Sequence, residues 1–500
     1  MPLITSGANA TIAVSANQIL TVIAHGGEYT FENPVGTRIV DSGSSNVFGP
    51  FPAAATVKLS SVQGDVYYEL ATAQATGGSA VQFLTDANNA PVAAQGTNGV
   101  KRVIGPYAAK NFVGTRILAG ASQNGFGLSA TNYTWSLQCA LPTDFMAVRL
   151  VLQNGLTSAI TGVTACASVG GTSTDRVNNA GAWVNATFSG ASSVTLPAAT
   201  VTTDPTITTS DWVPLASIAR VDGGTLPLLY VRCLTPAANT QAPLNGLGVA
   251  ITGWATKADG LIWAWRFQSG DFVTTPSGMT GSSDPSASPI VGVQYLARDG
   301  AILSVAAFGD SIISAYSSTI PGDGFVSRAV SSYGKGASVA NMGWTGQTTD
   351  KFLIRAQRYI PAFRPSHAMY FVYSPNDGAA PTAAIIAAQH ARALQFVDLC
   401  RQYGTYPILC TGLPRTTDST DTVSSYSNAQ DDLRKAFNNK VATLGVEVCD
   451  LATAISNSTA LGTASLWVSA AATLDGLHPS ESGNDLLAAK ALTTLNQFAA

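Results

Sequence analysis

A serine in a tight turn after an apolar run is the first residue whose position suggests chemistry. In Phe308-Gly309-Asp310-Ser311-Ile312 the serine follows the apolar run 302–308 and a glycine turn. Such a turn raises a hydroxyl at the end of a strand, where the backbone N–H of the serine can face a developing oxyanion. Ser311 is therefore a candidate nucleophile, and a serine nucleophile needs a base.

Histidine is the usual base for serine, and the chain contains only His25, His367, His390 and His478. His478 alone has a carboxylate, Asp475, three residues upstream in the same turn. That spacing lets one loop present both groups, with the carboxylate orienting the imidazole. Taken alone, the same turn could serve only to begin the final helix, so the assignment depends on the other polar blocks of the chain.

Four short polar blocks occur in one region, and each follows a predicted strand or precedes a predicted helix. They are Gly309-Asp310-Ser311, 341–348, 374–378 and 475–479. Residues at the carboxyl ends of parallel strands meet at one sheet edge. In residues and in order, the blocks resemble those of the SGNH (GDSL-type) hydrolase family, over residues 300–500. That family comprises esterases, lipases and carbohydrate or peptidoglycan acyl esterases, and the resemblance implies a three-layer α/β domain with a parallel sheet.

The resemblance also implies a role for individual residues. Ser311 corresponds to the nucleophile, His478 to the general base and Asp475 to the carboxylate that orients it. The oxyanion would be held by the N–H groups of Ser311 and Gly346 and by the side-chain amide of Asn376. Because no metal-ligand cluster or phosphate-binding glycine loop accompanies these residues, we expect neither a metal nor a cofactor.

Two further residues are candidates for substrate binding, and each has an alternative. Trp344 adjoins the oxyanion block and could line an acyl or sugar pocket, or belong to the core. Asp377 follows Asn376 and, like Asp310, could instead form or brace a turn. The third block carries Pro375 before its asparagine, where the family more often has glycines.

After residue 300 the pattern alternates between strands and helices. Such alternation predicts a parallel sheet with helices on both faces. The expected strands are 302–308, 338–342, 367–373, 406–411 and 446–451; the expected helices are 324–333, 348–360 (ending before Pro361), 382–403, 427–444 and 480–498.

Before residue 300, short Val/Ile/Thr/Tyr-rich runs alternate with turn residues, which predicts all-β modules of sandwich or jelly-roll type. We therefore expect a multidomain chain with a β module at 1–80, a β-sandwich at 105–295 and the hydrolase domain at 300–500. In the run 261–267, Trp263 and Trp265 share one face, which could bind sugar rings or cover a core.

The β half carries two weaker resemblances. Residues 1–80 are similar in composition and pattern to β modules of tailed-phage virion proteins such as tail spikes. This resemblance implies attachment to other virion proteins and is compatible with a homotrimer, although the chain has no coiled-coil heptads. Residues 105–295 resemble the β-sandwich modules that accompany SGNH domains and would contact carbohydrate.

Composition excludes several classes of protein. The net charge is −3, from 26 basic and 29 acidic residues, which argues against a nucleic-acid binder and against attraction to anionic lipid. The chain has no apolar run of about 18 residues and no signal-peptide pattern at its start. The six cysteines have no metal or redox spacing, so we expect free buried thiols in a protein made in a reducing cytoplasm. The resemblance to virion modules implies that this is a host cytoplasm and that the protein is carried on the virion.

Together these observations predict a serine esterase that removes O-acyl groups, acetyl above all, from a cell-surface polysaccharide through an acyl-enzyme intermediate. The alternative is a non-catalytic carbohydrate-binding or structural virion protein that retains the fold. A lipase or thioesterase would favour a long apolar lid near the site, and the sequence shows none.

Overall fold

The computed structural model contains two compact units, Met1–Asn111 with Arg401–Tyr406 and Phe112–Cys400 with Pro407–Ala500. It describes residues 3–16, 18–24, 28–32, 38–42, 45–48, 53–63, 66–72, 82–85, 91–95, 101–102, 113–117, 122–127, 132–154, 157–171, 181–198, 206–237, 241–246, 255–256, 262–280, 287–298, 302–316, 318, 322–334, 336–420 and 422–498.

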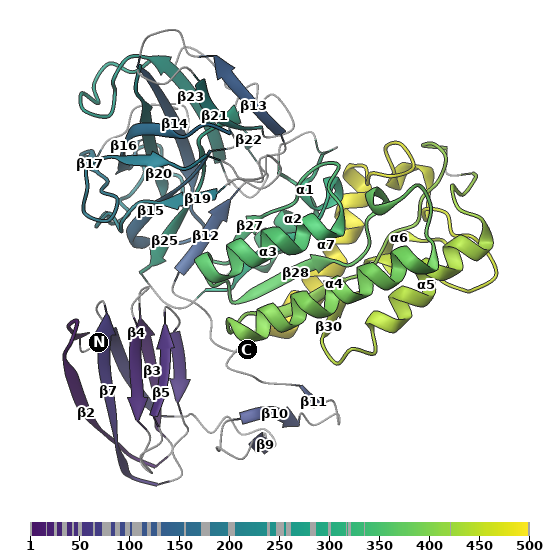
Figure 1. Ribbon diagram of the computed structural model, residues 1–500, viewed down its shortest axis with the longest axis horizontal. Coiled ribbons are helices and arrows are strands. Elements are labelled where there is room, and N and C mark those ends of the chain that lie inside the picture. Colours follow the sequence, from purple (N-terminus) through teal and green to yellow (C-terminus); the bar gives the residue numbers. More distant parts are fainter. Residues whose placement is uncertain are drawn as a thin grey trace. The chain divides into compact units, whose positions relative to one another are not determined.

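The first unit is built from strands (Figure 1). Two four-stranded antiparallel sheets, β1-β8-β3-β6 and β2-β7-β4-β5, share one apolar cluster that includes Leu20, Tyr29 and Val57. Alternation of apolar and polar residues turns one face of each sheet toward this core. The strands are β1 Leu3–Ile4, β2 Asn9–Val14, β3 Gln18–Ala24, β4 Glu28–Glu32, β5 Arg38–Ser42, β6 Ser45–Phe48, β7 Ala55–Gln63 and β8 Val66–Thr72, and a separate three-stranded sheet contains β9 Gln82–Thr85, β10 Pro91–Gln95 and β11 Lys101–Arg102.

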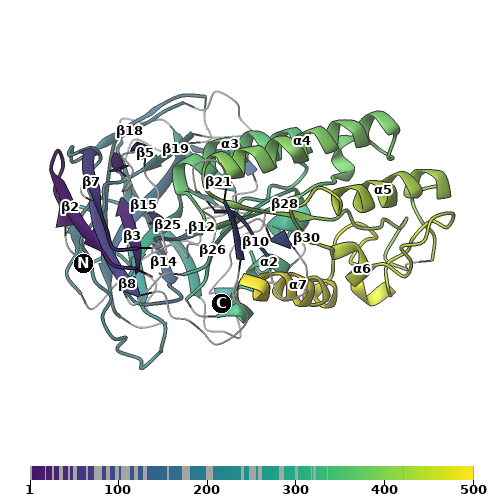
Figure 2. The ribbon, with the colours of Figure 1, turned by 90° about the horizontal axis from the view of Figure 1, so that it is seen from below.

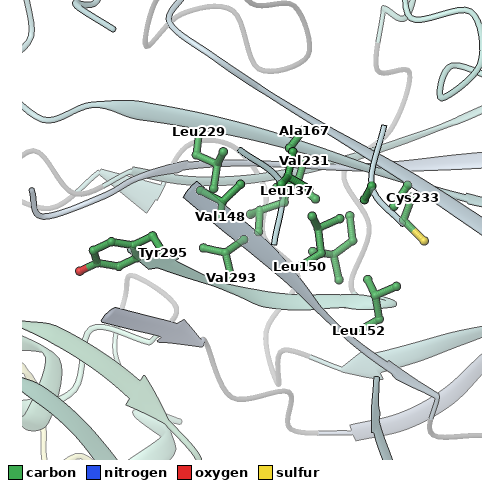
Figure 3. Packing of buried hydrophobic residues seen from close by; sticks show 14 of the residues in the cluster. Leu137, Val148, Leu150, Leu152, Ala167, Leu229, Val231, Cys233, Val293 and Tyr295 are labelled. Carbon is green, nitrogen blue, oxygen red and sulfur yellow. The ribbon is translucent and has the colours of Figure 1, made fainter. Parts of the chain in front are cut away.

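The second unit begins with two sheets that pack face to face. Side chains of β14, β16 and β20 meet side chains of β15 and β25 in a buried cluster that includes Leu137, Leu150 and Val293 (Figure 3). The strands of this region are β12 Val113–Ile117, β13 Ser122–Gly127, β14 Tyr133–Ala140, β15 Phe145–Asn154, β16 Ile160–Val169, β17 Val184–Asn185, β18 Val194–Leu196, β19 Thr206–Thr209, β20 Leu228–Thr235, β21 Gln241–Gly246, β22 Ala255–Thr256, β23 Ile262–Ser269, β24 Ala287–Ser288 and β25 Ile290–Ala297. The side chains of Trp263 and Trp265 lie outside the described part of β23.

The remainder of the second unit alternates strands and helices. Helices α3 and α4 cover one face of the sheet, and α2 and α7 cover the other (Figure 2). The strands are β26 Ser304–Phe308, β27 Ser338–Asn341, β28 His367–Phe371, β29 Tyr406–Cys410 and β30 Glu447–Cys449. The helices are α1 Ser311–Ser314, α2 Phe325–Tyr333, α3 Thr349–Phe363, α4 Ala383–Gln402, α5 Asn428–Val441, α6 Leu451–Ile455 and α7 Glu481–Leu495, with short 3₁₀ turns at η2 Pro375–Asp377, η3 Ala470–Ala472 and η4 Asn496–Phe498.

The sheet of this region is longer than the sequence predicts, and it is mixed. Strand β26 pairs in parallel with β27 and β28, and β29 pairs in parallel with β30. However, β12 joins β27 in parallel at Ile117 and pairs antiparallel with β25, so β12, β25, β15 and β19 extend the same sheet to nine strands. One sheet therefore serves both the β region and the α/β region, because a short strand distant in sequence connects them.

Helix α3 also differs from expectation, since it passes through Pro361 and ends at Phe363. Proline fixes φ at a value compatible with a helix, but it has no N–H. Near a helix end, its only cost is therefore the one backbone hydrogen bond that this N–H would have donated. Arg364 then closes the helix in a left-handed conformation, with its N–H donating to the carbonyl of Ile360 at 2.9 Å.

The start of α7 matches the expectation from sequence, because the side chain of Ser480 accepts the N–H of Gly483. The six cysteines are free and buried, as predicted. Within the described ranges, no helix is long and apolar enough to cross a membrane.

Candidate active site

Ser311 lies at the carboxyl end of β26, as the first residue of the short helix α1. A Cβ on Gly309 would stand 2.2 Å from Cγ1 of Ile313, so the close turn before Ser311 needs a glycine. Asp310 caps α1, because its Oδ1 accepts the N–H of Ile312 at 3.0 Å. The turn thus places the Ser311 hydroxyl at the sheet edge while leaving the residue only 5% exposed.

The structure brings Ser311, His478 and Asp475 into one hydrogen-bonded chain. His478 Nε2 lies 2.8 Å from Ser311 Oγ, although the two residues are 167 positions apart. His478 Nδ1 lies 2.7 Å from Asp475 Oδ2. Asp475 Oδ1 accepts the backbone N–H groups of Leu477 and His478 at 2.9 and 2.8 Å, so the loop folds around its own carboxylate.

The electrostatics of Asp475 determine which nitrogen of the imidazole carries the hydrogen. Burial works against ionisation, but the N–H of His478, its ring and the N–H of Leu477 outweigh it, and the pKa of Asp475 lies below its usual value. An ionised carboxylate only accepts hydrogen bonds, so Nδ1 of His478 is the protonated nitrogen. Nε2 of the neutral ring therefore presents its lone pair to the hydroxyl of Ser311.

The block 341–348 packs directly on the Ser311 turn. The N–H of Trp344 donates to the carbonyl of Gly309 at 2.9 Å, and Asn341 Nδ2 donates to the carbonyl of Ile313 at 2.8 Å. Gly346 adopts φ +74, a left-handed conformation that glycine tolerates best. Among the described residues, no acceptor receives the N–H of Gly346 or that of Ser311. Both N–H groups are thus available as donors.

Asn376 is tied to the same block from the end of β28. The 3₁₀ turn η2 begins at Pro375, where a missing N–H costs nothing, and Ser374 caps it by accepting the N–H of Asn376 at 3.2 Å. Asn376 Nδ2 donates one hydrogen to the carbonyl of Gln347 at 3.0 Å. The amide carries a second hydrogen, which remains for another acceptor.

Asp310 braces this arrangement from beneath. Its Oδ2 accepts the hydroxyl of Ser374 at 2.8 Å, which joins the turn of Ser311 to the turn of Asn376. Burial raises the pKa of Asp310 to about 6, even though the hydrogen bonds from Ile312 and Ser374 favour its charged form. Asp310 therefore acts on the position of two turns, as the sequence alternative proposed.

Asp377 is occupied by internal partners, which fits bracing better than the predicted contact with substrate. Its Oδ1 accepts the N–H of Thr349 at 3.0 Å, and its Oδ2 accepts the Thr349 hydroxyl and Gln389 Nε2, each at 2.7 Å. Arg392 lies 3.6 Å away. The carboxylate thus joins the first turn of α3 to α4.

Trp344 is likewise engaged inside the protein. It is 8% exposed, and the guanidinium of Arg355 lies 4.7 Å from its ring centroid. Arg355 in turn donates to the carbonyl of Met342 at 2.6 Å. These contacts favour the core alternative for Trp344 over a pocket-lining role.

Two residues near the site had no place in the sequence prediction. The ring of Tyr316 lies 5.0 Å from that of His478, and its side chain is 45% exposed. Arg415 lines a pocket that also contains Ile312 and Leu477, the neighbours of Ser311 and His478. Arg415 follows the end of β29, so the rule that chemistry gathers at strand ends could have identified it.

Metal ligands are not grouped here. Within the part of the chain that the structure describes, no three His, Cys, Asp or Glu side chains are placed to hold a metal ion.

Comparison with known proteins identifies the same region. A model of the GDSL-like lipase/acylhydrolase family matches residues 307–486. No curated protein matches the chain.

Several solved structures are similar to parts of the chain. One is a lipase/acylhydrolase from Enterococcus faecalis, with 23% identity, a TM-score of 0.29, and coverage of 39% of this chain and 95% of that one. Another is a catalytic mutant of an acetylxylan esterase from Geobacillus stearothermophilus, with 19% identity, a TM-score of 0.29, and coverage of 38% and 93%. A GDSL-like lipase from Bacteroides thetaiotaomicron has 18% identity, a TM-score of 0.29, and coverage of 39% and 87%.

The family match spans the turn of Ser311, the oxyanion block and the loop of Asp475 and His478. The carboxy-terminal region is therefore a domain of the GDSL-like lipase/acylhydrolase family.

Proposed function

We propose that this protein is a serine esterase that removes O-acyl groups, acetyl above all, from a cell-surface polysaccharide. The observation that carries the proposal is the chain of hydrogen bonds from Asp475 through His478 to Ser311, at 2.7 and 2.8 Å. The family of the domain supports ester hydrolysis as the class of reaction. The N–H groups of Ser311 and Gly346, which have no acceptor among the described residues, and the amide of Asn376 supply the donors that such a reaction needs.

In the first half of the proposed reaction, Ser311 Oγ forms a bond to the carbonyl carbon of the ester while His478 Nε2 takes its proton. The electrons of the carbonyl π bond move to its oxygen, which becomes an oxyanion. The N–H groups of Ser311 and Gly346 and the amide of Asn376 stabilise it, and each donor contributes about 3 kcal/mol. When the C=O bond re-forms, the bond to the alcohol breaks, and the imidazolium returns the proton to the departing oxygen.

In the second half, water replaces the alcohol. His478 Nε2 takes a proton from the water as its oxygen bonds to the acyl carbon, and the same donors hold the second oxyanion. Collapse breaks the bond to Ser311 Oγ, which recovers its proton from His478, and the carboxylic acid leaves. Asp475 remains ionised throughout and stabilises the imidazolium.

One exposed aromatic ring beside the site supports a saccharide as the alcohol. Tyr316 presents a 45% exposed ring beside His478, and aromatic rings of this kind bind the apolar faces of sugars. We also propose that the enzyme is made in a host cytoplasm and carried on a phage particle. There it would be a homotrimer attached to other virion proteins through residues 1–80. Sequence resemblance alone supports these proposals.

The test is turnover of 4-nitrophenyl acetate by the full chain, compared with Ser311→Ala. Ser332→Ala is the matched control, because Ser332 lies on α2 away from the Ser311 turn. We expect Ser311→Ala to lose at least about 10³-fold in kcat and Ser332→Ala to match the parent. Equal rates for all three proteins would favour the non-catalytic alternative. Acetate release from a panel of acetylated polysaccharides then identifies the glycan.

A further inference from the structure

A small pocket adjoins the residues of the proposed reaction. Its walls include Ile312, Pro375 and Leu477, which are the chain neighbours of Ser311, Asn376 and His478. Its free space of about 220 Å³ includes space open to solvent, so the pocket is a shallow recess and not an enclosed cavity. Whatever part of a substrate enters it is a small group close to the ester.

Two buried phenols are among the residues that line this mostly apolar pocket. The hydroxyls of Tyr373 and Tyr426 lie 2.8 Å apart and share one hydrogen bond. Two hydroxyl groups carry two hydrogens, and this bond uses one. Among the described residues, no acceptor receives the other, so the pair offers one free donor.

Arg415 lines the same pocket, and no described residue pairs with its charge. Its carbonyl accepts the N–H of Ser425 at 2.9 Å, but its guanidinium has no ion pair or hydrogen bond with any described residue. In contrast, the buried guanidinium of Arg434 lies 2.7 Å from Asp431. A half-buried guanidinium without an internal partner is available to bind an anion.

The charge of Arg415 affects the ionisation of Tyr373, another residue that lines the pocket. Burial raises the pKa of Tyr373 far above its usual value, and Arg415 acts on it in the opposite direction. Among the described residues that line the pocket, none is a carboxylate that could compensate Arg415. The pocket is therefore lined by Arg415 and by a pair of phenols with one free hydrogen, for which no described residue serves as acceptor.

We propose that this pocket holds a carboxylate of the substrate, so that the enzyme prefers esters that carry a carboxylate near the acyl group. This inference rests on the proposed function and narrows its substrate class. A planar carboxylate with one negative charge matches one guanidinium, whereas a phosphate dianion would leave a charge unpaired. The carboxylate has two sources, an acidic sugar that bears the ester or an acyl group derived from a dicarboxylic acid.

Two substrate pairs separate the sources, and the members of each pair differ in whether one carboxyl group is free or methylated. In the first, 4-acetoxybenzoate is compared with its methyl ester, which places the carboxylate on the alcohol. In the second, the mono-4-nitrophenyl ester of glutaric acid is compared with its methyl diester, which places the carboxylate on the acyl group. Rates with Ser311→Ala are subtracted as background. The parent should prefer the charged member of one pair at least about tenfold in kcat/KM, because a hydrogen bond to a charged group is worth about that factor.

The variants are Arg415→Gln, Arg415→Lys and Tyr426→Phe, with Lys440→Gln as the matched loss of an exposed positive charge on α5. Arg415→Gln should abolish the preference and leave the neutral esters unchanged within about threefold. Arg415→Lys should retain part of the preference for the charged ester, and Tyr426→Phe should reduce that preference. Lys440→Gln should show the same preference as the parent. If Arg415→Gln does not fold, a reduced preference for the charged ester in Arg415→Lys and Tyr426→Phe supports the inference, and an unchanged preference in both overturns it.

Hydrolysis of the neutral esters without preference in either pair would overturn this inference and leave the esterase proposal standing. A preference that persists in Arg415→Gln would also overturn it. Failure to hydrolyse any of the four esters would overturn both proposals.

Discussion

Replacing Asp475 by asparagine tests whether this carboxylate determines which nitrogen of His478 carries the hydrogen. Asp475 Oδ1 accepts two backbone N–H groups, and Oδ2 accepts Nδ1 of His478. In Asp475→Asn the amide oxygen can keep the two backbone bonds, so the amide nitrogen takes the place of Oδ2. That nitrogen donates, which makes Nδ1 of His478 an acceptor and moves the ring hydrogen to Nε2. Nε2 would then face Ser311 as a donor and could not take its proton.

The expected cost follows from this exchange of roles. The analogous substitution in a Ser-His-Asp site of another fold lowers kcat by about 10⁴-fold. For Asp475→Asn we expect a loss of about 10³- to 10⁴-fold, equivalent to about 4 to 5.5 kcal/mol of transition-state stabilisation. The fold should persist, because the side chain of Asp475 is 46% exposed and its backbone bonds survive.

The assay is kcat/KM for 4-nitrophenyl acetate, together with the thermal midpoint of each protein. Asp432→Asn is the matched control, because Asp432 also accepts a backbone N–H, that of Gly462, but lies on α5. It should match the parent in both measurements. If Asp475→Asn kept more than about a tenth of the parent activity with its fold intact, the tautomer argument would be wrong.

Three other predictions address the oxyanion donors, the rim of the site and the buried carboxylate. Asn376→Ala should lower kcat for an aryl acetate by about 100-fold with KM nearly unchanged, and an unchanged kcat would remove Asn376 from the oxyanion site. Tyr316→Ala should raise KM for the acetylated polysaccharide about tenfold while kcat for an aryl acetate stays within about threefold; equal KM values would contradict a sugar contact at this ring. Asp310 has a pKa of about 6 when folded against 3.8 in its ordinary state, so its contribution to stability is complete at low pH and is lost as the pH rises through about 6. The free energy of unfolding of the parent in urea, relative to that of Asp310→Asn, should therefore fall by about 2 kcal/mol between pH 4 and pH 7, and a difference independent of pH would contradict the raised pKa.

The sequence predicted the local elements of the α/β region closely. The strand before Ser311 and the cap at Ser480 depend on residues within a few positions of one another, and hydrogen bonds of that kind are legible in a single chain. The end of α3 was predicted one turn too early, because the cost of Pro361 depends on how many helical residues follow it.

In the proposed site, too, contacts within one turn were predictable from sequence, whereas contacts between distant segments were not. The sequence placed Asp475 and His478 in one turn, and their contact is local. Their approach to Ser311 could only be inferred from the order of the polar blocks. The engagement of Asp377 by Thr349 and Gln389 was not visible, since it depends on how α3 and α4 pack against η2.

By itself, the sequence indicated which residues are candidates for the chemistry and which elements hold them, since turns, caps and apolar periodicity act over a few residues. Only the tertiary structure decided that β12 joins the two regions into one nine-stranded sheet. It also decided that Arg415 lines the pocket beside Ser311 and has no side-chain partner among the described residues. Both results depend on pairings between segments far apart in the chain, and such pairings follow from packing of the whole rather than from any local pattern.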